Sequence, residues 1–421
     1  MRHGRLAKQR CCGALVALAL LSSRGNNPAR AGEEVGHSLK LSTEAGAREH
    51  WFWLSEILLH RAGLFDADRG RLVGSIASGS VGVGFAIYPH RSTDGHEIYI
   101  AESYFSRGVR GSRSDVVSVY DGSTLDFVTE IPIPPKRAEY MTGVASSALS
   151  DNGRWLAVFN VAPAQSVTLV DVAARSFVAE VETPGCSLVY PAGPERFFLL
   201  CGNGGAMLLS RSGPDASWTA KRTAPFFDPD KDPISEKGAR LGESWLFVSF
   251  EGQMHTIDVS GDELRFEPTW PLFDDADRSE NWRIGGQQVL AVHPGSGRLF
   301  ALVHQGGPDT HKDAGSEIWV FDLKSHARLA QIEVGNPIAS FLRDQARLGS
   351  ETFGERAASW ALETLLPNPG ADGILVTPDN QPRLIVAAMI PPAVMVHDAL
   401  TGERLGDVAG PGVALGLLAK P

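Results

Sequence analysis

The chain has 421 residues, of which 43% are hydrophobic and only 21% are charged. This hydrophobic content is enough for a large buried core, while 45 glycines and 26 prolines favour many short strands joined by tight turns. The formal net charge of −10 argues against a nucleic-acid-binding role.

The first 31 residues have the pattern of a secretory signal peptide. Basic residues precede a short apolar run at 12–21, and Ala29-Arg30-Ala31 supplies a small-residue cleavage motif before Gly32. This run is too short to span a bilayer, and no later stretch is long and apolar enough to do so. We therefore expect an exported mature chain, residues 32–421, without a membrane span.

Two of the four cysteines, Cys11 and Cys12, leave with this leader, so that Cys186 and Cys201 remain. An even pair in an oxidising compartment predicts a disulfide bond. The alternatives are two free thiols or half of a metal site, although no C-x-x-C motif or nearby histidine supports a metal.

One phrase recurs along the chain: apolar residues, an aspartate, a polar turn and a second alternating strand. Each copy has the form of a β-hairpin. A degenerate copy at 206–209 fills the doubled interval between the third and fourth aspartates. The spacing of about 40 to 75 residues is in or above the range of propeller blades. The aspartates of the six clearer copies are Asp66, Asp121, Asp171, Asp258, Asp322 and Asp398.

A turn followed by a strand precedes most of these hairpins, as at 150–159, 293–302 and 377–387. Two hairpins make one four-stranded blade, and radial repetition of blades removes exposed sheet edges. The sequence therefore predicts an all-β, seven-bladed β-propeller that fills 32–421 as a single domain. Unrelated hairpins in a β-sandwich are the alternative, which fits seven recurring copies less well.

Two segments depart from the strand pattern. Residues 49–60 are amphipathic and aromatic, which suits a helix or an opening strand. Residues 342–366 carry apolar side chains at helical spacing, so we expect a short helical insertion at 341–371. The insertion is either a lid on the propeller or an element that docks a partner.

The sequence contains no motif of a self-contained enzyme: no H-E-x-x-H, P-loop, G-x-S-x-G, EF-hand or C-x-x-C-H. One loop holds four residues of metal-ligating types, but their irregular spacing among Gly and Pro favours an ordinary polar connection. These residues are His304, Asp309, His311 and Asp313. A basic stretch at 107–113 either orders a loop or binds carboxylates of a partner.

Four segments support a family resemblance by their length and order. They are Tyr-Phe-Ser-Arg-Gly-Val-Arg-Gly-Ser-Arg-Ser-Asp at 104–115, Pro-Gly-Cys at 184–186 leading to Phe-Phe-Leu-Leu-Cys at 197–201, Asn-Trp-Arg-Ile-Gly-Gly-Gln-Gln at 281–288, and Thr-His-Lys-Asp at 310–313 followed by Glu-Ile-Trp-Val-Phe-Asp at 317–322. Together they resemble the heavy subunit of methylamine and aromatic-amine dehydrogenases. The resemblance runs from about Gly70 to Asp398.

This resemblance implies a periplasmic seven-bladed propeller in an α2β2 assembly. In that family the small subunit carries tryptophan tryptophylquinone, primary amines are oxidised to aldehyde and ammonia, and electrons pass to a small copper or haem protein. The heavy subunit supports the small subunit and lines the substrate channel. The resemblance thus implies no catalytic, cofactor-binding or metal-binding residue in this chain, in agreement with its lack of catalytic motifs.

The chain departs from the family pattern in two places. The family has Gly-Phe-Leu-Pro near the substrate channel, where this chain has Gly-Phe-Ala-Ile at 84–87. The helical insertion also differs from the family. Both differences leave open which amine is the substrate.

We expect the small subunit to contact five residues that lie in family-like segments outside the blade hairpins: Phe105, Arg107, Trp282, Arg283 and His311. Trp and Arg are frequent interface anchors, although Trp282 is alternatively a core residue at a blade edge.

Two other functions stay open. One is a non-enzymatic periplasmic propeller that acts as a binding or assembly scaffold. The other is a self-sufficient quinoprotein with a free quinone in the propeller axis, which needs a metal site and a ring of cations.

Overall fold

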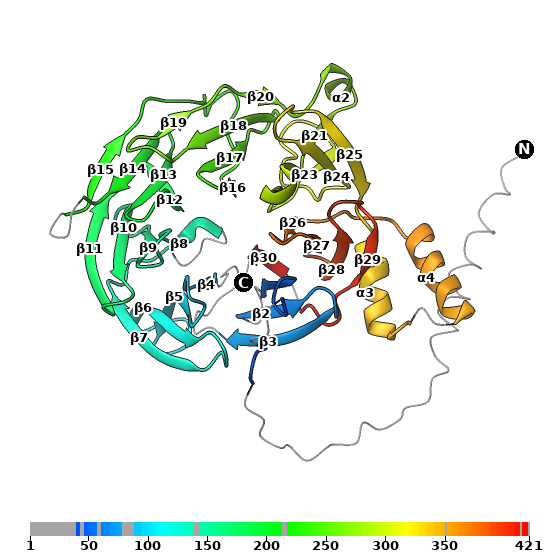
Figure 1. Cartoon of the computed structure of the whole chain (residues 1–421), viewed down its shortest axis with the longest axis horizontal. Coiled ribbons are helices and arrows are strands. Elements are labelled where there is room, and N and C mark those ends of the chain that lie inside the picture. The colour runs from blue at the N-terminus through cyan, green and yellow to red at the C-terminus, as the bar shows by residue number, and fades with distance from the viewer. Residues whose placement is uncertain are drawn as a thin grey trace, which may run out of the picture.

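The structure is a computed structural model that describes residues 39–42, 46–56, 60–77, 88–138, 144–212, 217–349, 352–412 and 415–419. The expected signal peptide and the 84–87 stretch lie outside these residues. Within the described part, seven antiparallel sheets surround a central axis as blades (Figure 1). This arrangement confirms the predicted all-β propeller. We letter the strands of each blade A to D from the axis outward.

The first four blades follow the order of the chain, except for one strand of blade 1. Blade 1 contains β30 (Leu415–Ala419), β1 (Trp51–Glu56), β2 (Arg61–Asp66) and β3 (Arg71–Ala77). Blade 2 contains β4 (His90–Arg91), β5 (Glu97–Phe105), β6 (Arg113–Asp121) and β7 (Phe127–Ile133). Blade 3 contains β8 (Ser147–Leu149), β9 (Trp155–Asn160), β10 (Ser166–Asp171) and β11 (Ser176–Glu182). Blade 4 contains β12 (Cys186–Pro191), β13 (Arg196–Cys201), β14 (Ala206–Ser210) and β15 (Thr219–Arg222).

The last three blades include two interrupted strands. Blade 5 contains β16 (Ala239–Leu241), β17 (Ser244–Val248), β18 (Gln253–Asp258) and a split outer strand, β19 (Arg265–Phe266) and β20 (Trp270–Pro271). Blade 6 contains a split inner strand, β21 (Trp282–Ile284) and β22 (Leu290–His293), with β23 (Arg298–Gln305), β24 (Glu317–Asp322) and β25 (Arg328–Glu333). Blade 7 contains β26 (Gly373–Val376), β27 (Arg383–Ala388), β28 (Ala393–Asp398) and β29 (Arg404–Asp407).

The ring is closed by strands from distant parts of the sequence. Strand β30 forms the inner edge of blade 1, where it pairs antiparallel with β1, with Trp53 opposite Ala419 and Leu54 opposite Leu418. Residues 51–56 are therefore the second strand of a blade, and not a helix. Blade 1 is thus built from three strands that precede the other six blades in the sequence and one strand that follows them.

The recurring aspartate ends strand C in six blades, which confirms the hairpins predicted from the sequence. In each case its Oδ1 atom accepts a hydrogen bond from a backbone N–H two or three residues later, as between Ser123 and Asp121 (2.7 Å) or Ala174 and Asp171 (2.9 Å). A side-chain oxygen that closes a turn in this way favours a tight C–D hairpin. In blade 4, Ser210 stands in this place at the end of β14.

The antiparallel strands give the ring two different faces. The A–B and C–D turns lie on one face, and the B–C loops and the links between blades lie on the other, which we call the BC face. Loops on the BC face come from all parts of the sequence. Residues distant in the chain can therefore form one surface there.

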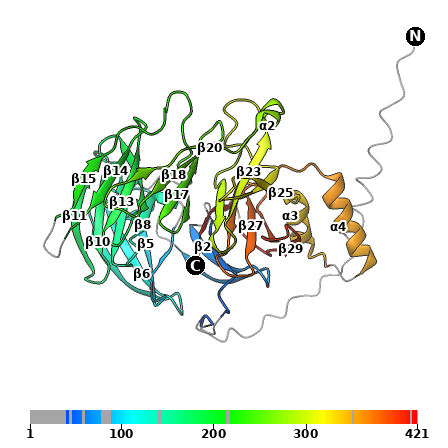
Figure 2. The same cartoon turned by 45° about the horizontal axis from the view of Figure 1, so that its top comes forward.

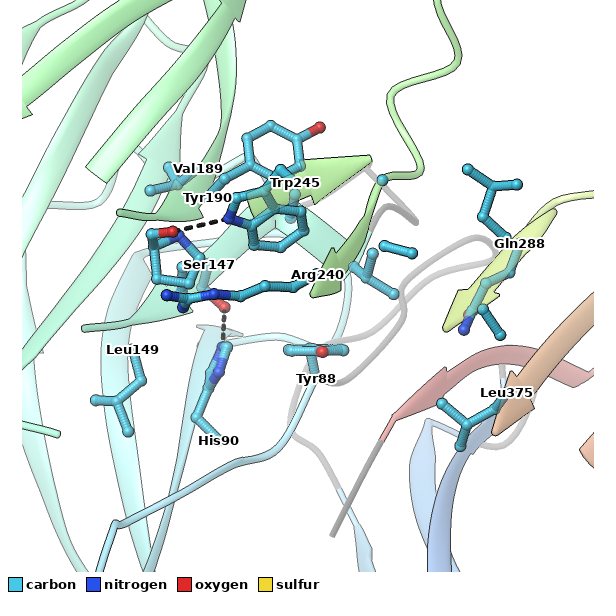
Figure 3. A pocket seen from close by; sticks show the side chains of 18 of the residues that line it. Tyr88, His90, Ser147, Leu149, Val189, Tyr190, Arg240, Trp245, Gln288 and Leu375 are labelled. Atoms are coloured by element: carbon cyan, nitrogen blue, oxygen red, sulfur yellow. Dashed lines mark hydrogen bonds between the residues drawn. The ribbon is translucent and has the colours of Figure 1, made fainter. Parts of the chain in front are cut away.

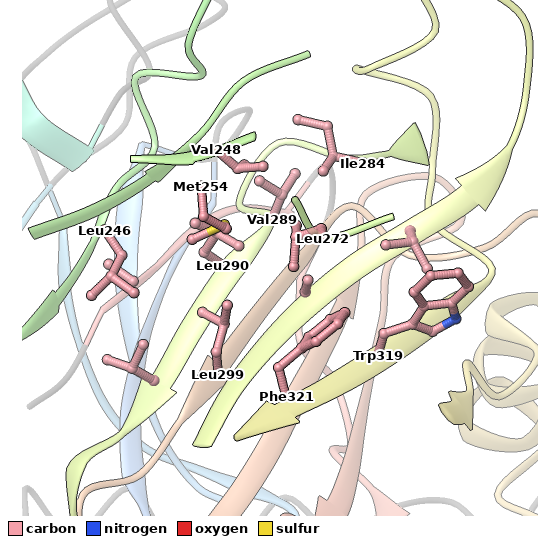
Figure 4. Close-up of a cluster of buried hydrophobic side chains, with 14 of the residues drawn as sticks. Leu246, Val248, Met254, Leu272, Ile284, Val289, Leu290, Leu299, Trp319 and Phe321 are labelled. Carbon is pink, nitrogen blue, oxygen red and sulfur yellow. The ribbon is translucent and has the colours of Figure 1, made fainter. Parts of the chain in front are cut away.

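The core lies between neighbouring blades. Between blades 5 and 6, side chains from both sheets interdigitate around Leu246, Met254, Leu290 and Phe321, and Trp319 is fully buried (Figure 4). Burial of each large apolar side chain contributes roughly 1.5–3 kcal/mol. Alternation along each strand sends successive side chains to the two sides of a blade, so every blade packs against both neighbours.

Helices are few among the described residues: the α-helices lie in the links between blades, and one of the two 3₁₀ turns lies in the A–B turn of blade 6. A short helix, α2 (Asp275–Ser279), precedes β21, and 3₁₀ turns occur at 144–146 and 294–296. The link between blades 6 and 7 contains α3 (Pro337–Ala346) and α4 (Phe353–Leu365). These two helices stand outside the ring beside β29 (Figures 1 and 2). Among the described helices, none has the length and hydropathy required to cross a bilayer.

Candidate functional site

The residues expected to contact a small subunit lie at the BC ends of two blades. Phe105 ends β5 and Arg107 follows it in the B–C loop of blade 2. Trp282 and Arg283 pair with Gln305 and His304 at the end of β23 in blade 6, and His311 lies in the next B–C loop. Blades 2 and 6 stand on different sides of the ring (Figure 1), so the structure places these residues in two separate groups on one face.

The blade 6 group packs against blade 5. The His311 ring stacks on Phe250 with 3.5 Å between the ring centroids. The Nη1 atom of Arg283 donates to Oε1 of Glu251 at 3.0 Å. Phe250 and Glu251 belong to the B–C loop of blade 5, so these contacts hold two neighbouring loops together as one surface.

Trp282 is both partly exposed and part of the core edge. Its ring lies 4.9 Å from the ring of Trp319, and its Nε1 donates to Glu280 at 3.2 Å. The side chain therefore supports blade 6 as well as facing the BC side. A truncation at this position will lower stability in addition to any effect on a partner.

His304 and His311, near the BC end of blade 6, both have a lowered pKa. Burial lowers the pKa of His304, and burial followed by the charge of Lys312 lowers the pKa of His311. His304 Nε2 lies 2.9 Å from the Thr310 hydroxyl. In the described part of the chain, no three His, Cys, Asp or Glu side chains are grouped so as to hold a metal ion.

One arginine of the basic stretch in blade 2 forms hydrogen bonds within the protein. Arg113 donates through Nε and Nη2 to both carboxylate oxygens of Asp115, at 2.7 and 2.8 Å, and Nη2 also reaches the Arg137 carbonyl at 2.7 Å. Asp115 in turn accepts from the Arg137 backbone N–H at 2.9 Å. Arg113 thus fixes the link from blade 2 to blade 3, whereas Arg107 and Arg110 are exposed on the loop.

Exposed apolar side chains in the B–C loops of blades 2, 3 and 7 were missed by sequence reasoning. Val109 of blade 2 is 68% exposed, Val161 of blade 3 is 50% exposed and Ile390 of blade 7 is 76% exposed. All three lie on the BC face, spread over three blades, where a partner that covers this face would bury them. The available signal was an apolar residue inside a turn between two strands, which does not by itself reveal exposure.

A cavity of about 390 Å³ lies on the propeller axis and is lined mainly by the A strands (Figure 3). His90 of β4 and Ser147 of β8 meet there with 2.8 Å between Nε2 and Oγ, and burial lowers the pKa of His90 to about 3. The Arg240 guanidinium forms an ion pair with Asp151. Among the described lining residues, Arg91 and Arg240 are the only permanently charged cations, so this lining does not form the cationic ring required by a free quinone.

The disulfide joins the inner two strands of blade 4. Cys186 of β12 and Cys201 of β13 face each other in the sheet and are bonded. Both sulfur atoms lie within the apolar core between blades 3 and 4. The bond therefore links strands A and B of blade 4 within the core and does not hold a surface loop.

The sequence matches one protein family over more than half of its length. A family model described as methylamine dehydrogenase heavy chain matches residues 60–348. This chain belongs to that family. Heavy chains of the family in general lack the tryptophan tryptophylquinone, which the light chain holds.

Individual heavy chains are similar over most of their length. The methylamine dehydrogenase heavy chain of Methylorubrum extorquens is 27% identical over 363 residues, which are 84% of this chain and 78% of that protein. The heavy chain of Paracoccus versutus is 25% identical over 348 residues, or 82% and 72% of the two chains. The heavy-chain match therefore extends beyond a single blade or motif.

Solved structures show the same fold at lower identity. The dihydro-heme d1 dehydrogenase NirN, solved in complex with DHE, has a TM-score of 0.55 at 16% identity, with 99% of this chain and 89% of that chain covered. A functionally unknown protein from Desulfotomaculum acetoxidans has a TM-score of 0.55 at 10% identity, with 88% and 99% covered. At these identities the likeness concerns the fold alone.

Proposed function

We propose that this chain is the heavy subunit of a periplasmic, quinone-dependent amine dehydrogenase that oxidises primary amines to aldehyde and ammonia. The observation that carries the proposal is the heavy-chain family match over residues 60–348. The cofactor, tryptophan tryptophylquinone, belongs to a light subunit in an α2β2 assembly. Electrons leave the complex through a small copper or haem protein.

In this proposal the BC face binds the light subunit. Apolar side chains at the loops of blades 2, 3 and 7 and the stacked His311–Phe250 pair offer contacts spread around one face. Arg107 and Arg110 add exposed cations for carboxylates of the partner. A surface that combines apolar contacts with arginine at its edge suits a stable protein partner.

The heavy subunit contributes shape and exclusion of water rather than a reacting group. Its described residues form a ring of blades, and the partner would be covered on the side that faces the BC loops. When a reactive carbonyl group of the partner is covered in this way, only substrates that enter through a channel between the subunits can reach it. The walls of such a channel on this side would come from BC-face loops.

Co-expression with a light chain of the same family tests the proposal. The co-purified complex should show the absorbance of a protein-bound quinone and reduce a dye when a primary amine is added. The heavy chain alone should do neither. Dye reduction by the chain alone, or a complex without a quinone, would contradict the proposal, and the second result would favour a non-enzymatic scaffold.

A further inference from the structure

The cavity on the propeller axis is formed where the A strands of the blades end. The last residues of β4, β8, β12 and β26 all line it, and these are Arg91, Leu149, Pro191 and Val376. Each A strand ends at its A–B turn, so the cavity lies toward the side of the ring opposite the BC face. Since one water occupies about 30 Å³ in the liquid, the volume of about 390 Å³ has room for about a dozen non-hydrogen atoms.

Most of the cavity wall is apolar, and two of its aromatic residues have their polar atoms occupied elsewhere. The rings of Tyr190 and Trp245 lie 5.1 Å apart in an edge-to-face arrangement. The Tyr190 hydroxyl donates to the carbonyl of Glu236 at 2.5 Å. The Nε1 atom of Trp245 donates to the carbonyl of Pro191 at 2.9 Å. Together with Leu375 from blade 7 (Figure 3), these rings form a wall that favours the apolar body of a small molecule.

The polar side of the cavity comes from β4, the residues just before it and β8. Burial raises the pKa of Tyr88 to about 12 and lowers the pKa of His90 to about 3, so both side chains are neutral at about pH 7. His90 and Ser147 bond to each other, with 2.8 Å between Nε2 and Oγ. Tyr88 lines the cavity as a protonated phenol, which can donate a hydrogen bond (Figure 3).

The charge on the cavity lining is positive. Among the described lining residues, Arg91 and Arg240 are charged, and none is an aspartate or a glutamate. Arg240 is already neutralised, because its Nη2 donates to Oδ2 of Asp151 at 2.7 Å and thereby joins blade 5 to blade 3. The Arg91 guanidinium forms no hydrogen bond or ion pair with any residue that the structure describes. Burial, and then the charge of Arg91, lowers the pKa of the neighbouring Arg48. Arg91 is therefore available to an anion, while a cation would find no opposite charge on this lining.

We propose that the axial cavity binds a small organic monocarboxylate with an apolar ring or chain. The carboxylate is held by the Arg91 guanidinium, whose planar fork matches the two carboxylate oxygens. The Tyr88 hydroxyl offers a second donor, and the apolar body of the ligand lies against the aromatic and aliphatic wall. The ligand carries a single carboxylate, because Arg240 is already paired with Asp151.

This inference does not rest on the proposed amine dehydrogenase function. The cavity lies toward the side opposite the BC face, and its positive lining disfavours the ammonium form of a primary amine. A carboxylate ligand is therefore neither the substrate of that reaction nor part of the light-subunit surface. Failure of either proposal leaves the other intact.

Isothermal titration of the full mature chain at about pH 7, where carboxylates are ionised and amines are protonated, tests the ligand class. Benzoate, phenylacetate and hexanoate are the carboxylate probes, benzylamine is the cationic comparison and benzyl alcohol is the neutral one. At least one carboxylate should bind with a dissociation constant of about 0.1–1 mM. Benzyl alcohol should bind at least about tenfold more weakly, because it lacks the charge that Arg91 recognises, and benzylamine should not bind measurably.

Three variants locate the binding site. Arg91→Gln should raise the dissociation constant of the tightest carboxylate at least about tenfold and leave that of benzyl alcohol unchanged. Leu149→Trp fills the cavity from β8 and should abolish binding of both ligands. Arg110→Gln removes an exposed arginine of the BC face and should bind as wild type does.

Melting temperatures identify the variants that are folded, and Arg91→Gln should keep the wild-type value because its side chain is exposed. Failure of all three carboxylates to bind would overturn the proposal and leave solvent as the occupant of the cavity. Benzylamine binding as tight as that of the carboxylates, wild-type affinity in Arg91→Gln, or binding that survives in folded Leu149→Trp would also overturn it.

Discussion

The Nε2 atom of His50 lies 3.1 Å from Oδ1 of Asp379, although 329 positions separate the two residues. His50 precedes β1 of blade 1, and Asp379 lies in the A–B turn of blade 7. The other ring nitrogen of His50 contacts Asp68, which Arg383 of blade 7 also binds at 2.8 Å. These four side chains link the first and last blades by charged hydrogen bonds. This link adds to the pairing of β30 with β1.

This junction predicts a pH-dependent stability. Burial lowers the pKa of His50, but hydrogen bonds and charges from Asp68 and Asp379 outweigh it and raise the pKa above 6.5. A raised pKa in the folded protein means that the stabilisation is complete below about pH 6.5 and is lost as pH rises through the folded value. Burial raises the pKa of Asp379, but its hydrogen bonds lower it on balance, so the stabilisation is also lost in acid.

We expect His50→Ala to lower the free energy of unfolding by about 1–2 kcal/mol near pH 6. Asp68 is half exposed, so solvent screening limits its share. Urea unfolding at a series of pH values should show the difference between wild type and variant shrinking as the solution becomes alkaline. His96→Ala alters an exposed histidine and serves as the control. A difference that is constant with pH would refute the assignment.

The disulfide between Cys186 and Cys201 closes a loop with a sequence separation of 15 residues. In the chain-entropy description, this loop stabilises the fold by about 3 kcal/mol. Replacing both cysteines with alanine should lower the free energy of unfolding by that amount, and reduced wild type should behave similarly. Mass spectrometry of unreduced protein should find no alkylatable thiol on either residue, and two alkylated thiols would disprove the bond.

The apolar tips on the BC face give a direct test of light-subunit binding. Val109→Glu and Ile390→Glu place a charge where the partner would exclude water, and each should weaken binding at least about tenfold. Since both side chains are well exposed, the melting temperature of the free heavy chain should not change. Leu329→Glu, on an outer strand, should bind as wild type does. Normal co-purification of both BC-face variants would place the interface elsewhere.

Trp282 and Arg107 are expected to differ in their effects. Trp282→Ala should weaken co-purification of the light subunit and also lower the melting temperature, because the Trp282 ring packs against Trp319. Arg107→Ala should weaken binding alone, because its side chain is exposed. A Trp282→Ala variant that loses stability but binds normally would show that this residue serves only the core.

The repeated aspartate predicts a local contribution at each hairpin. Asp171 accepts from the Ala174 backbone and from two nitrogens of Arg154, at 2.8 and 3.0 Å for the latter. Asp171→Ala should lower the free energy of unfolding by about 1–2 kcal/mol, whereas Asp171→Asn should retain the turn and lose less. Thermal and urea unfolding of the two variants should rank them in that order, and equal stabilities would refute a role for the turn.

The hairpins were predictable because their signals are local. An aspartate after an apolar strand closes the next turn through its own side chain, so six copies stand out within a few residues each. The contact of His50 with Asp379 left no such signal, since both residues are ordinary polar residues until the ring brings them together. The exposure of Ile390 and Trp360 was equally hidden, because it depends on which neighbours fail to cover them.

The pairing of β30 with β1 has a consequence for how the molecule tolerates a cut in its backbone. The ring of blades is closed without a covalent join at blade 1, because this blade is built from two segments that are distant in the sequence. After a single cut in the link between blades 6 and 7, the two fragments would therefore still be held together on both sides of blade 7. On one side blade 7 packs against blade 6, and on the other side β30 pairs with β1 in blade 1. The nicked protein should migrate as one particle until denatured, and the same link is a rational site for new chain ends in a circular permutant.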